Sequence, residues 1–483
     1  MEPVNIIIIG VGPHARRIYI PILMELSKSM PIRLVGAVDL QKQKEVVDLY
    51  LKEKECFLKA LYFDPFDAAE GLPDNCIITL DTLVKDLNIH GVVISTEPTA
   101  HKVYAEWALK RGLHILMDKP ISVRKSICTE SSQAQALIKD YEDLLELYNQ
   151  QQLIRPTAFS ISAQRRYEYG FEMAKKLIAE VRDRFNMPVT SIQAMHADGT
   201  WMFPKEVLSQ ESHRHFDGYG KVSHSGYHIF DMVWQLYEAG LVDKKRPDHL
   251  EILSSPLLPS GLSIDLNEND YQKYFGHEYE SIPLSEKEYR EKVKTYGEID
   301  SFNIIRLLKG NENICNISIN LLHSSFSRRS WAIPNADRYK GNGRVKHQQF
   351  IIQQGPFQCI QIHNYQSKGS HDVDNSTEYG AGGNNHFDIY VFRNREMFGS
   401  GEAFYKVSAK DLEEKECVSR LNVENAKERV ILEFVNFMLG KVNVDNLKSN
   451  IDTHNIPVKI MSGVYQSSIR LINHQNPLIS MSI

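Results

Sequence analysis

The chain has 483 residues, 42% hydrophobic and 24% charged, with 56 Lys and Arg against 61 Asp and Glu and a net charge of −5. These are the proportions of a folded globular protein rather than of a disordered or fibrous one, and the length predicts two or three domains. Without a dense run of Lys or Arg the chain has no basic footprint for nucleic acid or an anionic membrane. We therefore expect small-molecule ligands, and neither nucleic acid nor membrane as a partner.

The cysteine spacing and the length of the apolar segments indicate the cellular compartment of the protein. The six cysteines are scattered without a C-x-x-C pair, which favours reduced thiols. No apolar run reaches the roughly 18 residues that a membrane span needs, and the first ten residues lack the features of an export signal. We predict a cytoplasmic protein.

The first 120 residues alternate between short apolar runs and helical patterns. Strands that alternate with helices predict a doubly wound parallel sheet. A long helix over 129–152 ends before Pro156, so we place the boundary of the first, α/β domain at residues 1–155. The expected strands cover residues 4–9, 33–38, 76–80, 91–95 and 113–117, and the expected helices cover 16–29, 42–61 and 101–111.

Residues 156–483 are predicted to form an α+β domain with a large, mostly antiparallel open sheet. Two polar stretches, 266–297 and 367–385, are longer than ordinary connections, and we expect insertions there that shape a pocket or an interface. The expected strands cover 157–163, 188–197, 314–322, 348–353, 357–363 and 387–392, and the expected helices cover 169–184, 426–439 and 458–472.

A glycine motif joins the first strand to the first helix, Gly10-Val-Gly12-Pro-His-Ala15. In a dinucleotide fingerprint the first Gly permits a tight turn, the second lets the backbone approach the pyrophosphate, and a small third residue lets helix and strand pack. The motif predicts a Rossmann fold with the diphosphate at the helix N-terminus. The expected cofactor residues here are Gly10, Gly12, Pro13, His14 and Ala15.

Asp39 ends the second predicted strand. A carboxylate at this position can bond both ribose hydroxyls and repel a 2′-phosphate, which favours NAD over NADP. Alternatively, Asp39 only caps the next helix.

Further segments resemble those of the Gfo/Idh/MocA oxidoreductases, which include inositol dehydrogenase and glucose-fructose oxidoreductase. Ser95-Thr-Glu-Pro-Thr-Ala-His101 is similar to the family's T-x-P-x-x-x-H element, and Asp118-Lys119-Pro120 to its E-K-P element. The family's second-domain signature is matched at Gly226, His228 and Asp231, and Arg166-Tyr167 is similar to its R-[FY] element. The resemblance covers residues 1–240.

This resemblance implies the catalytic roles. Lys119 would reach the nicotinamide ribose and the substrate hydroxyl, and His228 would take the hydroxyl proton as hydride passes to the nicotinamide. An ammonium stabilises a developing alkoxide, and imidazole titrates close to working pH. Most of the family has Asp four residues before this His, whereas this chain has His224. His224 would serve as a neutral partner or a second proton carrier, so catalysis is expected to be altered, slower or absent.

The resemblance also implies the ligands. We predict an NAD-dependent dehydrogenase acting on a secondary hydroxyl or ketone of a sugar, cyclitol or sugar nucleotide, as a homodimer or homotetramer formed through the second-domain sheet. The alternatives are an NAD-dependent glycosidase and a non-catalytic regulatory protein that senses NAD or a sugar. The expected cofactor residues also include Thr96, Pro98, His101, Asp118 and Lys119, and the expected substrate residues are Lys119, Arg166, Tyr167, His224 and His228.

Several of these residues have a second interpretation. His101 could cap a helix, Lys119 could be a surface lysine, and Asp231 could be a structural partner of His228. Trp201 and Tyr167 could stack on a sugar ring or belong to the core. A group of histidines could bind zinc, but no Cys joins it, so we expect no metal. This group is His196, His213, His215, His224 and His228.

Overall fold

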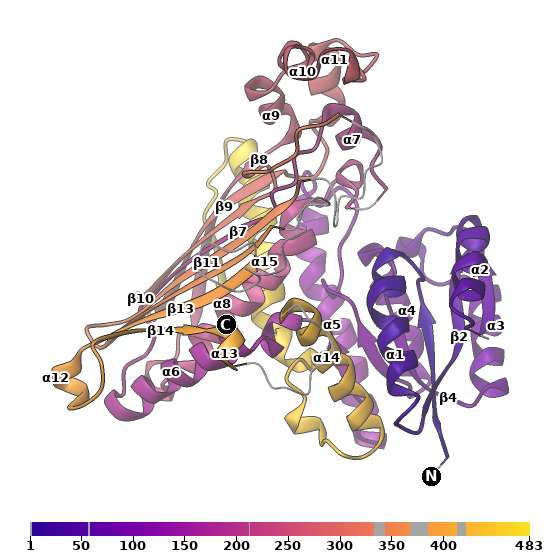
Figure 1. Cartoon of the computed structure of the whole chain (residues 1–483), viewed down its shortest axis with the longest axis horizontal. Coiled ribbons are helices and arrows are strands. Elements are labelled where there is room, and N and C mark those ends of the chain that lie inside the picture. The colour runs from indigo at the N-terminus through magenta and orange to yellow at the C-terminus, as the bar shows by residue number, and fades with distance from the viewer. Residues whose placement is uncertain (1, 57, 212, 333–342, 368–384, 413–421) are drawn as a thin grey trace. The chain divides into compact units, whose positions relative to one another are not determined.

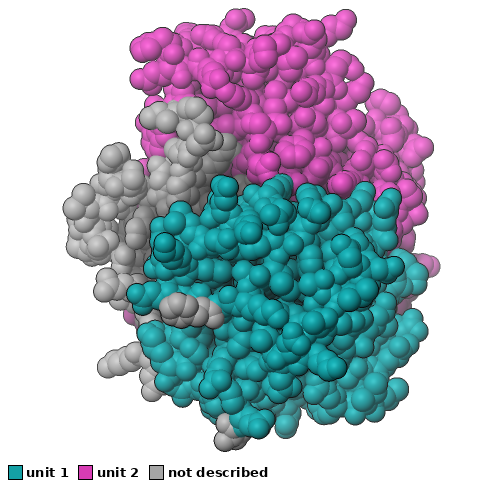
Figure 2. Space-filling view, turned by 90° about the vertical axis from the view of Figure 1, so that its right-hand side faces the viewer, with its two compact units in different colours: residues 1–123, 137–168, 416–458 teal, residues 124–136, 169–415, 459–483 magenta. Residues whose placement is uncertain are grey.

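The computed structural model describes residues 2–56, 58–211, 213–332, 343–367, 385–412 and 422–483 (Figure 1). Contacts divide the chain into two units, coloured separately in Figure 2. Unit 1 comprises Met1–Val123, Leu137–Glu168 and Glu416–Val458, and unit 2 comprises Arg124–Ala136, Tyr169–Lys415 and Lys459–Ile483. The expected boundary at residue 155 lies inside unit 1, because the strand that follows it completes the sheet of that unit.

Unit 1 contains a six-stranded, fully parallel sheet in the order β3-β2-β1-β4-β5-β6, which confirms the predicted doubly wound sheet. Its central strands are apolar and buried, as in a sheet covered on both faces. The strand order reverses between β1 and β4, which is where open α/β sheets bind ligands. The strands are β1 (Val4–Ile9), β2 (Ile32–Leu40), β3 (Lys59–Phe63), β4 (Ile89–Ile94), β5 (His114–Met117) and β6 (Phe159–Ile161).

Two predicted elements of this part of the chain are wrong. The expected strand at 76–80 lies inside a helix, because Cys76, Leu80 and Leu83 are buried along one helical face. The expected helix over 42–61 ends at Glu53, and the residues from Lys59 form an edge strand of the sheet. The helices here are α1 (Ile20–Leu26), α2 (Lys44–Glu53), α3 (Asp74–Asp86), α4 (His101–Lys110), α5 (Ser131–Ile154) and α14 (Asn422–Met438).

Helix α14 belongs to unit 1, although it was expected in the second domain. Its residues Val430, Ile431 and Phe434 are buried in one hydrophobic core with Ile6 and Ile8 of β1. The core of unit 1 is therefore completed by residues from near the end of the chain.

Unit 2 contains a nine-stranded sheet in the order β14-β13-β12-β11-β7-β10-β9-β8-β15. Among its described strands only β7 and β10 pair in parallel, so the predicted mostly antiparallel sheet is confirmed. The strands are β7 (Ser191–Ala197), β8 (His249–Leu257), β9 (Asp300–Lys309), β10 (Glu312–Leu322), β11 (Val345–Gln354), β12 (Gln358–Ser367), β13 (Asn385–Arg393), β14 (Phe404–Ser408) and β15 (Ile479–Ser482).

Helices cover one face of this sheet (Figure 1): α6 (Tyr169–Phe185), α8 (Tyr227–Ala239) and the part of α15 (Asn455–Ile472) that belongs to unit 2. Glycines let these helices pack close to the sheet. A Cβ atom on Gly170 of α6 would lie 2.2 Å from the ring of Phe387 on β13, and one on Gly463 of α15 would lie 2.4 Å from Ile252 on β8. The opposite face of the sheet exposes apolar side chains, among them Phe302 and Ile304 of β9.

The first expected insertion, 266–297, contains two helices, α10 (Glu268–Phe275) and α11 (Glu286–Val293). Asn267 and Ser285 cap them, each accepting a backbone N–H of the first turn. The second, 367–385, falls almost wholly on residues 368–384, outside the described part of the chain. The remaining helices of unit 2 are α7 (Pro204–Ser209), α9 (Pro259–Asp265), α12 (Arg395–Phe398) and α13 (Ala409–Leu412).

None of the helices in the described ranges combines the length and the apolar character that a membrane span requires. The five cysteines within these ranges are free thiols.

Candidate functional site

The glycine turn after β1 has the geometry of a dinucleotide site. Gly10 has φ +90°, and a Cβ atom on it would lie 2.4 Å from the carbonyl oxygen of Ser95, so only glycine fits. A Cβ atom on Gly12 would meet nothing within 4 Å, so the backbone there is open to a ligand. Beyond it the helix opens in a π-helical turn over Ala15–Tyr19, a feature frequent at functional sites.

Asp39 is bound to this turn. The N–H of Val11 donates to its Oδ2 at 2.7 Å, and the N–H of Leu40 donates to its Oδ1 at 2.7 Å. The alternative role as a helix cap is not observed, because no side chain caps α2. The carboxylate therefore lies beside the open backbone of the glycine turn.

Asp118 directly follows β5 and joins the glycine-turn helix to the residue after β4. It accepts hydrogen bonds from the hydroxyls of Tyr19 at 2.6 Å and Ser95 at 3.0 Å, and His14 Nε2 lies 3.8 Å away. Burial tends to raise the pKa of Asp118, but His14, the Tyr19 hydroxyl and Lys119 together hold it below its ordinary value. An ionised carboxylate thus precedes Lys119, which is partly buried and joined to Pro120 by a cis peptide bond.

His101 connects two loops of unit 1. Its Nδ1 lies 2.7 Å from the carbonyl oxygen of Pro120, and its Nε2 lies 3.2 Å from that of Thr96. It is fully buried, and no side chain caps α4, so the alternative role of His101 as a helix cap is not observed. Thr96 packs against Gly10, and Pro98 begins the short turn that leads into α4.

Arg166 and Tyr167 are buried inside unit 1. Arg166 is 1% exposed, and its guanidinium donates to the carbonyl oxygen of Lys448 at 2.7 Å and to the hydroxyl of Thr453 at 2.6 Å. The hydroxyl of Tyr167 donates to Glu433. These contacts give both side chains a structural role, so the substrate site proposed below rests on other residues.

In unit 2 the matched signature lies where a helix meets the sheet. His224 belongs to a π-helical turn, Val222–Gly226, that runs directly into α8, and His228 lies in the first turn of α8. A Cβ atom on Gly226 would lie 2.7 Å from Leu321 of β10, so glycine lets this helix approach the strand. His224 and His228 are 6% and 5% exposed, and Asp231, one turn further on, is fully buried.

Imidazole rings gather around His224. Its ring centroid lies 4.4 Å from that of His213 and 5.4 Å from that of His215, and His215 lies 5.5 Å from His323. Burial, together with His323, lowers the pKa of His215 to about 3, so this ring is neutral. Among the residues that the structure describes, no three His, Cys, Asp or Glu side chains are arranged to hold one metal ion, so the zinc interpretation gains no support.

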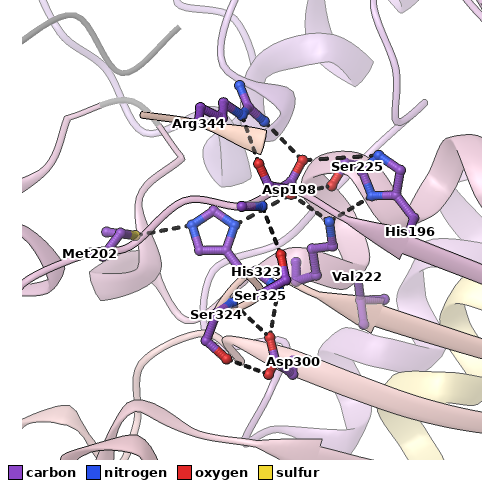
Figure 3. Close-up of polar contacts among 12 residues, drawn as sticks. His196, Asp198, Met202, Val222, Ser225, Asp300, His323, Ser324, Ser325 and Arg344 are labelled. Carbon is purple, nitrogen blue, oxygen red and sulfur yellow. Dashed lines mark hydrogen bonds and ion pairs between the residues drawn. The ribbon is translucent and has the colours of Figure 1, made fainter. Parts of the chain in front are cut away.

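A buried ionic network, centred on Asp198 just beyond β7, was not foreseen (Figure 3). Its carboxylate accepts from Lys221, from Arg344 at 2.8 Å and from the hydroxyl of Ser225 at 2.9 Å, with His323 Nδ1 at 3.3 Å. Lys221 is 0% exposed, and burial lowers its pKa to about 8 despite the opposing effect of Asp198.

The sequence held two signals for this network. Lys221 shortly precedes the residues that match the family signature, and Asp198 directly follows the predicted strand 188–197. His196 joins through its Nδ1, 2.7 Å from the Lys221 ammonium, rather than through the histidines around His224.

Residues 4–139 match the Gfo/Idh/MocA family model, described as an oxidoreductase family with an NAD-binding Rossmann fold. This segment therefore matches an NAD-binding Rossmann domain, and the predicted resemblance is confirmed over it. The residues present also fit NAD, because Gly12 leaves the backbone open and Asp39 offers a carboxylate beside it. No match was found among curated proteins.

Solved structures of oxidoreductases share the fold over the whole chain. An oxidoreductase domain protein from Kribbella flavida has 12% identity and a TM-score of 0.58, covering 100% of both chains. An oxidoreductase from Agrobacterium radiobacter, in complex with NAD+, L-tartaric acid and magnesium, has 10% identity and a TM-score of 0.56, covering 99% of this chain and 98% of its own. An aldose-aldose oxidoreductase from Caulobacter crescentus, complexed with glycerol, has 12% identity and a TM-score of 0.54, covering 100% of both chains.

Proposed function

We propose that the protein is an NAD-dependent dehydrogenase that transfers hydride between nicotinamide and a secondary hydroxyl or ketone of a sugar, cyclitol or sugar nucleotide. The observation that carries the proposal is the open glycine turn at Gly12 with the Asp39 carboxylate hydrogen-bonded to it. The family match of residues 4–139 supports the reaction class. The sugar-like substrate rests on the family resemblance and on the likeness to an aldose-aldose oxidoreductase.

NAD would be held through its diphosphate by the backbone of Gly12 at the helix N-terminus, and through a ribose by Asp39. Bound NAD would supply the hydride acceptor or donor. Thr96 and Pro98 are proposed to complete the site, with Asp118 holding the loops around it. Pro13, His14 and Ala15 would belong to the same turn.

Three side chains are proposed to act on the substrate. The Lys119 ammonium would stabilise the alkoxide that develops as the hydroxyl is oxidised, and the His228 imidazole would take the hydroxyl proton. His224, whose ring packs against other imidazoles, would act as a second proton carrier in place of the carboxylate that most of the family has there.

The first test is a calorimetric NAD titration, followed by an NADH absorbance assay with a panel of inositols, hexoses, amino sugars and nucleotide sugars. Reduction of NAD by one compound supports the proposal and identifies the substrate class. Release of an alcohol from a glycoside without net NADH points to the glycosidase, and NAD binding without any turnover points to the regulatory protein. Absence of NAD binding overturns the proposal.

We also propose a homodimer or homotetramer that forms through the open face of the unit 2 sheet. This face exposes large apolar side chains in two groups, one on β8 and β9 and one on β13 and β14, and exposed apolar surface of this kind marks interaction sites. These side chains are Leu253, Phe302, Ile304, Phe392 and Phe404.

A further inference from the structure

Glu298 is a buried carboxyl, just before β9, that three separate segments of unit 2 contact. It is 2% exposed. Its Oε1 accepts the N–H of Val222 at 2.6 Å and the hydroxyl of Tyr465 at 3.4 Å, and its Oε2 accepts the thiol of Cys128 at 2.8 Å. Val222 begins the π-helical turn that contains His224, Tyr465 belongs to α15, and Cys128 precedes α5.

The backbone holds Glu298 firmly against this turn. The N–H of Lys221 donates to the carbonyl oxygen of Glu298 at 3.0 Å. A Cβ atom on Gly220 would lie 2.0 Å from that same oxygen, and one on Gly297 would lie 2.0 Å from the carbonyl oxygen of Tyr219. Two glycines therefore let the chain segments cross in direct backbone contact, so the Glu298 carboxyl has little room to move away from Val222.

We infer that Glu298 is the positioning residue for His224 and His228, and that its protonation state sets how firmly the turn carrying them is held. The inference deepens the proposed function and rests on it for its catalytic meaning. Ionised Glu298 accepts a charge-assisted hydrogen bond from Val222 at the start of the helix, where negative charge is favoured. Protonated Glu298 loses the charge, and one of its oxygens becomes a donor.

The surroundings of Glu298 set the pH at which it changes state. Burial raises its pKa to about 7, against the opposing hydrogen bonds of Cys128 and Val222. Among the described residues, the titratable groups that contact its carboxyl are Cys128 and Tyr465. Burial raises the pKa of both well above their ordinary values, so both remain protonated donors at neutral pH. The positioning is thus expected to change near neutrality.

The first test measures stability against pH with Glu298→Gln, which keeps the shape and removes the titration. The pKa of Glu298 is higher in the folded chain than the ordinary value near 4.5, so the unfolded state releases its proton first as pH rises. As pH rises from about 4.5 to 7, the melting temperature of wild type should therefore fall relative to that of the variant. Above about pH 7 the difference between the two melting temperatures should stay constant. A difference in melting temperature that does not change with pH would show that Glu298 does not titrate in this range.

The second test follows local order by hydrogen exchange of the peptide 221–230. The exchange ratio of Glu298→Gln to wild type should be near one at pH 5.5 and fall about five- to tenfold at pH 8.5, because only wild type then carries a buried charge, and opening relieves its burial. A peptide over residues 5–20, in unit 1, is the control and should show no such change in the ratio. An equal ratio at both pH values would overturn the positioning role.

A matched pair of variants at Cys128 tests the mechanism. Cys128→Ala removes a donor to the ionised carboxyl and should move the stability transition to higher pH, whereas Cys128→Ser keeps a donor and should not. If both variants behave alike, the thiol contact has no part in the titration. None of these measurements uses NAD or a substrate, so a failed dehydrogenase assay and a failed role for Glu298 remain distinguishable.

Discussion

A buried or half-buried carboxylate organises each candidate site at the scale of single residues. In unit 1 Asp118 accepts two hydroxyl groups and precedes Lys119, and in unit 2 Asp198 accepts Lys221 and Arg344. Both carboxylates have their pKa held below the ordinary value by neighbouring groups, against the effect of burial. Each thus fixes cationic or polar side chains in place while keeping its own charge.

Replacing Lys119 with Ala separates binding from chemistry. NAD binding should remain measurable by calorimetry, because the glycine turn and Asp39 are intact. The rate of hydride transfer with the identified substrate should fall at least about 100-fold, because no cation then stabilises the developing alkoxide. Lys110→Ala, at an exposed position of α4, is the control and should keep full activity. Unchanged turnover in Lys119→Ala would refute the role given to this lysine.

Breaking the buried pair of Asp198 and Lys221 should strongly destabilise the protein. Asp198→Asn leaves the ammonium of Lys221, which is 0% exposed, without its anion, and is expected to lower the free energy of unfolding by about 3–5 kcal/mol in urea denaturation. The double variant Asp198→Asn/Lys221→Met should lose less than the sum of the single losses. Additive losses would mean that the two side chains are not energetically coupled.

At the scale of elements, both candidate sites begin a helix with a π-helical turn, Ala15–Tyr19 in unit 1 and Val222–Gly226 in unit 2. A wider turn changes which side chains face the strand behind, and such turns are frequent at functional sites. Glycine assists both: Gly10 lets the first turn approach β4, and Gly226 lets α8 approach β10.

Two neighbouring glycines should respond oppositely to the same substitution. Gly12→Ala adds a methyl group that meets no protein atom within 4 Å, so melting temperature should hold while NAD affinity falls by about tenfold or more. Gly10→Ala is strained at φ +90° and collides with Ser95, so it should lower the melting temperature itself. Normal NAD affinity in a folded Gly12→Ala variant would contradict the proposed diphosphate site.

At the scale of the whole molecule, the two sheets differ in how they are covered. The unit 1 sheet is buried at its centre, whereas the unit 2 sheet has helices packed on one face and exposes Phe302 and Ile304 on the other at 48% and 54%. The proposed oligomer would cover this second face.

The variant Phe302→Ser/Ile304→Ser should reduce the molar mass in light scattering to that of one chain, because it removes apolar area from the proposed contact. Ile78→Ser, at an exposed position of α3 in unit 1, is the control and should leave the mass unchanged. A wild-type protein that is already monomeric would overturn the proposed assembly.

The elements of this fold that depend on short sequence patterns could be predicted from the sequence. The glycine motif, the strands around it and the mostly antiparallel second sheet follow from short periodicities. The prediction for residues 76–80 was wrong because a short, mostly apolar run fits a buried strand and a helix equally well. The sequence marked single members of the Asp198 network but could not join them, since they come from β7 and the residue after it, from the π-helical turn and from just before β11. Spacing along the chain does not encode such contacts. The burial of Arg166 was not predicted for the same reason.

The place of α14 in the core of unit 1 has a consequence for synthesis. Ile6 and Ile8 leave the ribosome early, but Val430, Ile431 and Phe434, which share their core, follow only after nearly all of unit 2 has been made. Until α14 has been synthesised, the nascent unit 1 therefore exposes the apolar surface that α14 later covers. Chaperones bind exposed apolar surface of this kind.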